Sequence, residues 1–250
     1  GISGINYAFN LSMKLLRRMS FSLRTLILTG GPALILLFLA GCQSARMEHR
    51  EVFQKHLPAT FPSNYHVEDS RVLELRRVLI LPVTNGPGIK NTSLEAIDQA
   101  FRARLTDTRL FEVVQIDRDT LSRITGSPTF GSVQPLPESL LHYASETLQA
   151  DGILTIDLTS YHPYRPIRMG TRCMLVDLKT KEVVWAVDET FDSARADVAW
   201  EAMRYEARTR TAAFPVSTGS SILRSPRRFS EFAAEMCFLS LPENRLSPKF

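Results

Sequence analysis

Val78-Leu79-Ile80-Leu81-Pro82-Val83 is the stretch on which the predicted fold depends. A continuous apolar run of this length is typical of a strand buried on both faces of a sheet. Apolar residues then recur at helical spacing at Leu94, Ile97, Phe101 and Leu105, and Phe111 to Ile116 is a second apolar run directly after them. This order predicts a strand, a helix and a second strand, which normally means parallel strands joined by a right-handed crossover.

The chain downstream adds further elements to this unit. We expect a short helix at Asp117 to Ile124, a helix beginning at Pro137, a third strand at Ile153 to Leu158, strands at Cys173 to Leu178 and Glu182 to Phe191 that form a hairpin, a long helix from Ser193 to about Thr211, and a last helix at Pro226 to Leu239. The sequence therefore predicts an α/β fold with a mixed sheet of about five strands, a strand–helix–strand start, a β-hairpin and helices packed on the sheet.

Upstream, Leu34 to Cys42 forms an apolar segment that ends in Leu39-Ala40-Gly41-Cys42, with basic residues before it. A basic region, a short apolar region and small residues at the cleavage point are the layout of an export signal. The four residues resemble the bacterial lipobox, in which a signal peptidase recognises Leu39, Ala40 and Gly41. The resemblance implies that Cys42 is diacylated and becomes the first residue of the mature chain.

A transmembrane anchor is the alternative for this segment. Leu26 to Ala40 is only fifteen residues long and contains Gly30-Gly31-Pro32, whereas a spanning helix needs about 20 predominantly apolar residues. We therefore favour a cleaved signal at 1–41, followed by a lipidated N-terminus and tether at 42–76 and an α/β domain at 77–250. Whether Met13 or Met19 starts translation stays open.

The charge of the chain argues against nucleic acid as a partner. The sequence has 30 Lys and Arg against 26 Asp and Glu, but four basic residues and no acidic residue precede Cys42, so the charges balance from Cys42 onward. A nucleic-acid-binding domain needs a surplus of positive charge. Of the three cysteines, Cys173 and Cys237 remain after Cys42, and a disulfide or two buried thiols are both open.

No motif in the sequence predicts an active site. There is no Gly-x-Ser-x-Gly elbow and no Gly-Lys-Ser/Thr phosphate loop, and neither His142 nor His162 has a His or Cys at ligand spacing. Asp157 lies in an apolar strand, where we expect it to point off the core or to cap a neighbour. We accordingly predict no catalytic residue, no metal site and no cofactor.

Aromatic residues form the one candidate recognition surface. Tyr161, His162 and Tyr164 lie in a segment that Pro163 and Pro166 make rigid, and Trp200 lies off the apolar stripe of the long helix. A packed turn is the alternative for the first three, and partial burial is the alternative that the pattern favours for Trp200. We expect the charged side chains on the outer side of that helix, Glu201 and Glu206 among them, to be solvated.

The order and spacing of several segments resemble the TolB amino-terminal-like fold of bacterial envelope lipoproteins. These segments are Val-Leu-Ile-Leu-Pro-Val-Thr-Asn (78–85), Phe-Glu-Val-Val (111–114), Ala-Asp-Gly-Ile-Leu-Thr-Ile-Asp-Leu-Thr-Ser-Tyr (150–161) and Leu-Val-Asp-Leu-Lys-Thr-Lys-Glu-Val-Val-Trp (175–185). The group includes CsgG-like curli-secretion, PelC-like polysaccharide-export and penicillin-binding-protein-activating lipoproteins. Gln149 and Lys181 replace glycines of its pattern. The resemblance implies a role in binding and assembly, often in oligomeric rings, without a cofactor.

These observations favour a non-enzymatic lipoprotein that assists envelope assembly or export through protein–protein contacts. Gln43 after the lipidated cysteine indicates sorting to the outer membrane, with the domain facing the periplasm. The expected partners are the membrane, through the lipid on Cys42, envelope proteins and a homo-oligomer. The alternatives are a monomeric binder of glycan or peptidoglycan and a hydrolase of wall polymer. The identity of the partner and the pathway stay open.

Overall fold

A computed structural model describes residues 61–86, 94–209 and 221–242. All the described residues belong to one compact unit. The predicted signal sequence and Cys42 lie outside the described residues. No helix among the described residues is long and apolar enough to span a bilayer.

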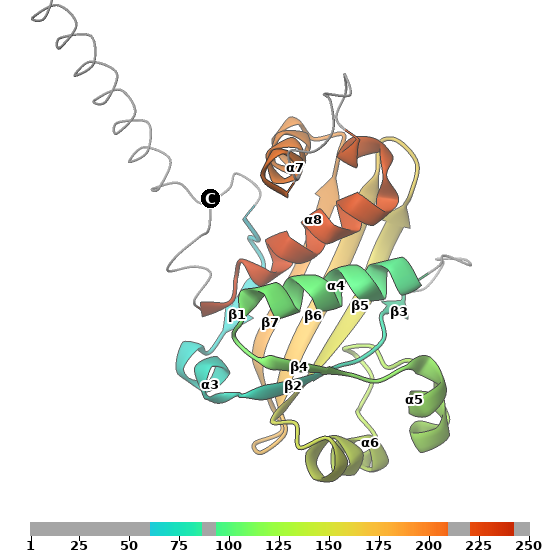
Figure 1. Ribbon diagram of the computed structural model, residues 1–250, viewed down its shortest axis with the longest axis vertical. Coiled ribbons are helices and arrows are strands. Elements are labelled where there is room, and N and C mark those ends of the chain that lie inside the picture. The colour runs from blue at the N-terminus through green and yellow to red at the C-terminus, as the bar shows by residue number, and fades with distance from the viewer. Residues whose placement is uncertain (1–60, 87–93, 210–220, 243–250) are drawn as a thin grey trace, which may run out of the picture. The chain divides into compact units, whose positions relative to one another are not determined.

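The described residues form a mixed α/β fold (Figure 1). The strands are β1 (Tyr65–Val67), β2 (Arg77–Ile80), β3 (Thr84–Asn85), β4 (Glu112–Gln115), β5 (Gly152–His162), β6 (Arg168–Asp177) and β7 (Glu182–Asp192). The α-helices are α3 (Asp69–Glu74), α4 (Glu95–Thr108), α5 (Arg118–Thr125), α6 (Glu138–His142), α7 (Ala196–Thr209) and α8 (Pro226–Phe238), with a π-helical turn at Tyr143–Thr147 and a 3₁₀ turn at Ile222–Arg224.

The sheet has the order β1-β7-β6-β5-β2-β4, and β3 pairs with β5. β2 pairs in parallel with β4 and with β5, so the predicted strand–helix–strand start is confirmed. β5, β6 and β7 are antiparallel neighbours, and the predicted hairpin of β6 and β7 is confirmed as well. The mixed α/β class is therefore confirmed, but the sheet has seven strands instead of about five.

Two described elements, β1 and α3, precede Arg77, within the segment 42–76 that we expected to be the lipidated N-terminus and tether. β1 pairs antiparallel with β7, and Val72 of α3 is fully buried in the core. β3 is the other added strand, and its residues Thr84 and Asn85 pair in parallel with Asp157 and Leu158 of β5. β1 and β3 have three and two residues, and such short strands give almost no alternating pattern in the sequence.

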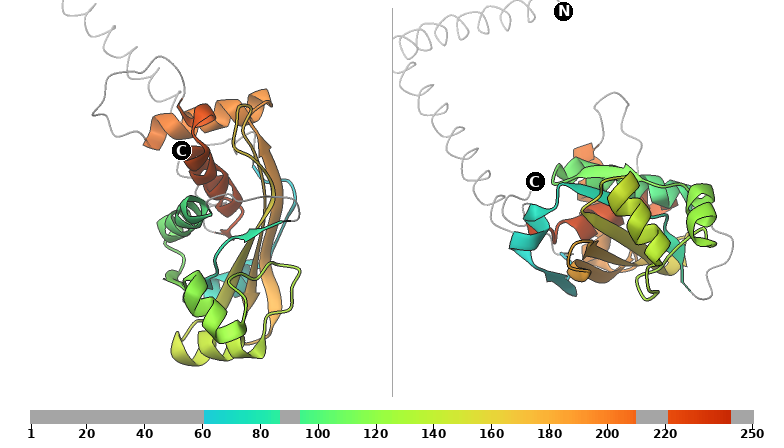
Figure 2. Two further views of the ribbon diagram at one scale, coloured as in Figure 1. Left: turned by 90° about the vertical axis from the view of Figure 1, so that its right-hand side faces the viewer. Right: turned by 90° about the horizontal axis from the view of Figure 1, so that it is seen from below.

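Helices cover the two faces of the sheet at β2. Val78 and Ile80 point into a larger core with residues of α4, α7 and α8, whereas Leu79 points into a smaller core with residues of α5 and α6. Successive side chains of a strand point to opposite faces, which explains why the whole run is apolar. Figure 2 shows α4 and α8 together on one side of the long strands.

The last helix is fixed to the sheet through Trp185 of β7. Trp185 is 1% exposed, packs against Phe238 with ring centroids 5.8 Å apart and donates a hydrogen bond from Nε1 to Ser240 Oγ at 2.9 Å. Trp185 therefore belongs to the larger core. Cys173 and Cys237 are buried free thiols, and burial raises the pKa of Cys173 well above its usual value.

Candidate functional site

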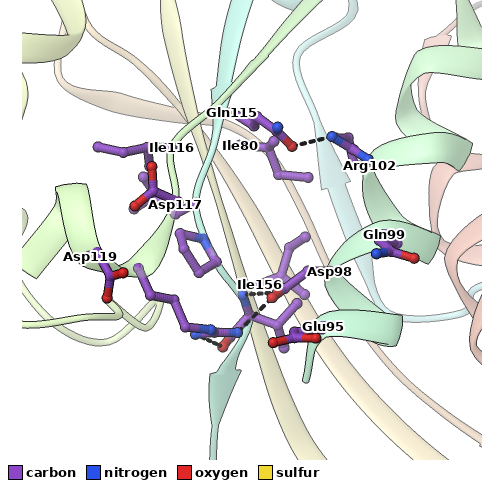
Figure 3. A pocket seen from close by; sticks show the side chains of 14 residues that line it. Ile80, Glu95, Asp98, Gln99, Arg102, Gln115, Ile116, Asp117, Asp119 and Ile156 are labelled. Carbon is purple, nitrogen blue, oxygen red and sulfur yellow. Dashed lines mark hydrogen bonds and ion pairs between the residues drawn. The ribbon is translucent and has the colours of Figure 1, made fainter. Parts of the chain in front are cut away.

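A cleft of about 500 Å³ opens where the parallel strands β2 and β4 end (Figure 3). Its walls come from residues 80–83 after β2, from the first turns of α4 and from residues 115–119 between β4 and α5. α4 and α5 contribute to different cores, so this is the place where the covering helices change face. Open α/β sheets bind ligands at such places, outside the carboxyl ends of their strands.

An ion pair closes one side of the cleft. Arg118 Nη2 donates to Asp98 Oδ2 at 2.7 Å, and Arg118 Nη1 donates to the carbonyl of Val83 at 3.1 Å. The backbone N–H of Val83 donates to Asp98 Oδ1 at 2.7 Å. Burial raises the pKa of Asp98, although the Val83 N–H and Arg118 both favour its ionised form. Both carboxylate oxygens are thus engaged, and the pair holds α4 and α5 against the end of β2.

Arg102, Gln115 and Asp117 of the cleft also have partners. Arg102 donates to Gln115. Asp117 caps α5 by accepting from Thr120 N at 2.7 Å, and this hydrogen bond lowers the pKa of Asp117. The arrangement suits binding of a polar group better than proton transfer. Sequence reasoning missed Asp98 and Arg118, because each lies in an ordinary helical pattern and only the fold brings them together.

Asp157 has the structural role expected from the sequence. It is 8% exposed, and its carboxylate accepts from the backbone N–H of Ser132 at 3.0 and 3.1 Å and from the hydroxyl of the same residue. It therefore fastens the loop before α6 to β5. The part of the chain that the structure describes holds no group of three or more His, Cys, Asp or Glu side chains that could bind a metal ion.

The predicted aromatic segment lies at the end of β5 and in the β5–β6 connection. Tyr161 and His162 belong to the end of β5, and Tyr161 packs against the larger core, so burial raises its pKa. His162 Nδ1 lies 3.0 Å from the carbonyl of Tyr164, and their rings make an edge contact. Tyr164 is 75% exposed.

Trp200 lies on a different element, α7, and is 59% exposed. Met203, one turn further along, is also exposed, and sequence reasoning missed it although its spacing from Trp200 is helical. Our expectation that Glu201 and Glu206 are solvated is wrong, since they are 3% and 5% exposed. Glu201 pairs with Arg204 and Glu206 with Arg228, while Trp200 and Met203 are exposed.

No protein-family model matches the sequence, and no curated protein matches it. Among solved structures, the chain is similar to the PelC dodecamer of Paraburkholderia phytofirmans (13% identity, 50% of this chain and 77% of that chain, TM-score 0.34). It is also similar to lipoprotein GNA1162 of Neisseria meningitidis (15% identity, 53% of this chain and 94% of that chain, TM-score 0.38). A third similar structure is the LpoB C-terminal domain of Escherichia coli (17% identity, 46% of this chain and 81% of that chain, TM-score 0.34). A fold shared at such identities does not specify function. The function therefore has to be argued from this chain's own residues.

Proposed function

We propose that this protein is a lipoprotein of the bacterial cell envelope that assists assembly or export through protein–protein contacts, without catalysis or a cofactor. Lipid on Cys42 anchors it, and the α/β domain faces the periplasm from the outer membrane. The anchor rests on the basic, apolar and lipobox order of the sequence around Leu39 to Cys42.

The observation that carries the contact role is the outward face of α7. Trp200 and Met203 are exposed there, beside Arg204, whose carboxylate partner Glu201 is buried. Trp, Met and Arg are enriched in protein interfaces, and a buried Trp is a frequent hot spot. An indole left in water on a well-packed helix is best explained by a partner that covers it.

Capture from envelope extract tests the contact role. The full chain should retain envelope proteins that the double variant Trp200→Ala, Met203→Ser releases. A matched control is Val133→Ser, because Val133 is 78% exposed on the loop before α6 and should not affect capture. Equal capture by the double variant, or turnover of an envelope polymer by the purified chain, would contradict the proposal.

Fractionation tests the anchor separately. Cys42→Ser should move the protein out of the detergent-extractable membrane fraction and abolish incorporation of a palmitate analogue. An unchanged distribution of Cys42→Ser would refute lipid anchoring and leave the contact role to be judged by capture alone.

A further inference from the structure

The outward side of α7 carries four apolar residues, which we name the outer stripe: Ala196, Trp200, Met203 and Ala207. All four are exposed. The opposite side of the helix already packs on the larger core through Val198, Ala202 and Tyr205. α7 is thus apolar on two sides, and the other described residues cover only one of them. Figure 1 shows α7 at the edge of the described fold, beyond α8.

The spacing of the outer stripe is symmetric. The residues are separated by four, three and four positions, so the sequence order of large and small side chains reads alike from both ends. If a second α7 lies antiparallel with its two-fold axis between Glu201 and Ala202, each Trp200 meets the partner copy's residue 203. Each Ala196 then meets the alanine at 207. Trp and Met sulfur make favourable contacts, and alanines at both ends let the helices approach closely.

The charges on one flank of the stripe fit the same arrangement. Asp197, Arg204 and Arg208 lie on one side of it, from the helical spacing of about 100° per residue. In an antiparallel pair like flanks face each other. Along the helix axis, Asp197 of one copy then lies opposite residue 206 of the second copy. That position is midway between Arg204 and Arg208 of the second copy. Within the protomer these side chains pair with Arg195, Glu201 and Glu235, respectively, and they remain 34%, 32% and 26% exposed. Opposite charges of the two copies can therefore also approach each other across the axis.

We propose that the outer stripe of α7 binds the same stripe of a second copy of this chain, in an antiparallel, two-fold symmetric contact. Such an isologous contact uses one patch twice and closes on itself. This inference deepens the proposed function by naming one protein partner. It rests on the contact role of α7, and it is independent of acylation at Cys42.

Thiol cross-linking tests the geometry directly. In the proposed pair the two residues at 203 are about 4.5 Å apart along the helix axes, and the axes are about 8–10 Å apart. The full chain carrying Met203→Cys, purified in detergent, should therefore form a dimer with a short bismaleimide. Val133→Cys is the matched control at a second exposed site. Equal cross-linking of both variants, or none at Met203→Cys, would overturn the proposal.

Sedimentation of the purified full chain over a range of concentrations tests the charges and the stripe. Asp197→Lys sets like charges against the two arginines and should raise the dimer dissociation constant about tenfold or more. Glu146→Lys makes the same charge change at an exposed position outside α7 and should leave the constant unchanged. Circular dichroism confirms that each variant is folded.

The remaining outcomes separate this dimer from the proposed function. A wild-type chain that sediments as a monomer at every concentration refutes the dimer. If Trp200→Ala, Met203→Ser nevertheless abolishes capture of envelope proteins, the stripe serves a different protein and the contact role stands. If the same variant instead weakens cosedimentation with phosphatidylglycerol vesicles, the stripe binds lipid and the dimer is again refuted.

Discussion

Replacing Trp185 with Phe tests how the last helix is held to the sheet. Trp185 is almost fully buried between β7 and α8, and its Nε1 donates to the Ser240 hydroxyl, which itself donates to the carbonyl of Cys237 at 2.7 Å. Phe keeps one aromatic ring but removes the donor and part of the buried surface. Ser240 retains its own donated hydrogen bond, so no buried donor is left without a partner.

Three contributions set the expected cost of Trp185→Phe. The lost apolar area corresponds to about 1 kcal/mol, the lost hydrogen bond to about 1 kcal/mol, and the small cavity left behind to about 1 kcal/mol. We therefore expect the free energy of unfolding to fall by about 3 kcal/mol. In urea this moves the unfolding midpoint down by roughly 1–3 M.

Fluorescence makes the measurement specific, because the chain has only two tryptophans. Trp185→Phe leaves Trp200 as the single emitter, and Trp200→Phe leaves Trp185. Since Trp200 is mostly exposed in the protomer, its replacement should change the free energy of unfolding by less than about 0.5 kcal/mol at protein concentrations where the chain is monomeric. A loss below about 1 kcal/mol for Trp185→Phe, or equal losses for the two variants, would refute the placement of Trp185 under α8.

Three further substitutions test other parts of the fold. Gly170→Ala should destabilise by about 1–3 kcal/mol in urea unfolding, because the added Cβ would lie 2.6 Å from Ser160 Oγ; an unchanged midpoint would contradict that approach. The backbone N–H of Ala194 and a neighbouring guanidinium hold the pKa of Asp192 below its usual value. Asp192→Asn should therefore be less stable than wild type at neutral pH, with a difference that vanishes as pH falls below about 4; a constant difference across a pH series of urea midpoints would refute this. Tyr205 is 2% exposed, its hydroxyl has no hydrogen-bond partner among the described residues, and burial raises its pKa to about 12. Tyr205→Phe should leave stability unchanged or raise it by up to about 1 kcal/mol, and a thermal melt that shows a loss would count against this placement.

The parts of the fold with strong local patterns could be predicted from the sequence. The apolar run at β2 and the helical spacing in α4 predicted the strand–helix–strand unit in which β2 and β4 are parallel. The short turn at residues 179–181 predicted the β6–β7 hairpin. In each case neighbouring residues carry the information, because periodicity and turn length act over a few positions.

The features that depend on distant contacts could not be predicted. β1 forms by pairing with the edge of β7, which lies more than a hundred residues later in the sequence. The burial of Glu206 depends on the later segment at Ser221 and Ile222, which hydrogen bonds to its carboxylate. The ion pair of Asp98 and Arg118 likewise joins two helices that only the crossover places together. Charge and helical spacing alone assign such side chains to solvent.

The most direct test of the account is the mass of the N-terminal peptide of the mature protein, purified from bacterial membranes. The account predicts a peptide that begins at Cys42 with a diacylglyceryl group on its sulfur, and no acylated peptide from Cys42→Ser. A mature chain that retains residues 34–41, or that carries an unmodified Cys42 while it stays in the membrane fraction, would contradict the account.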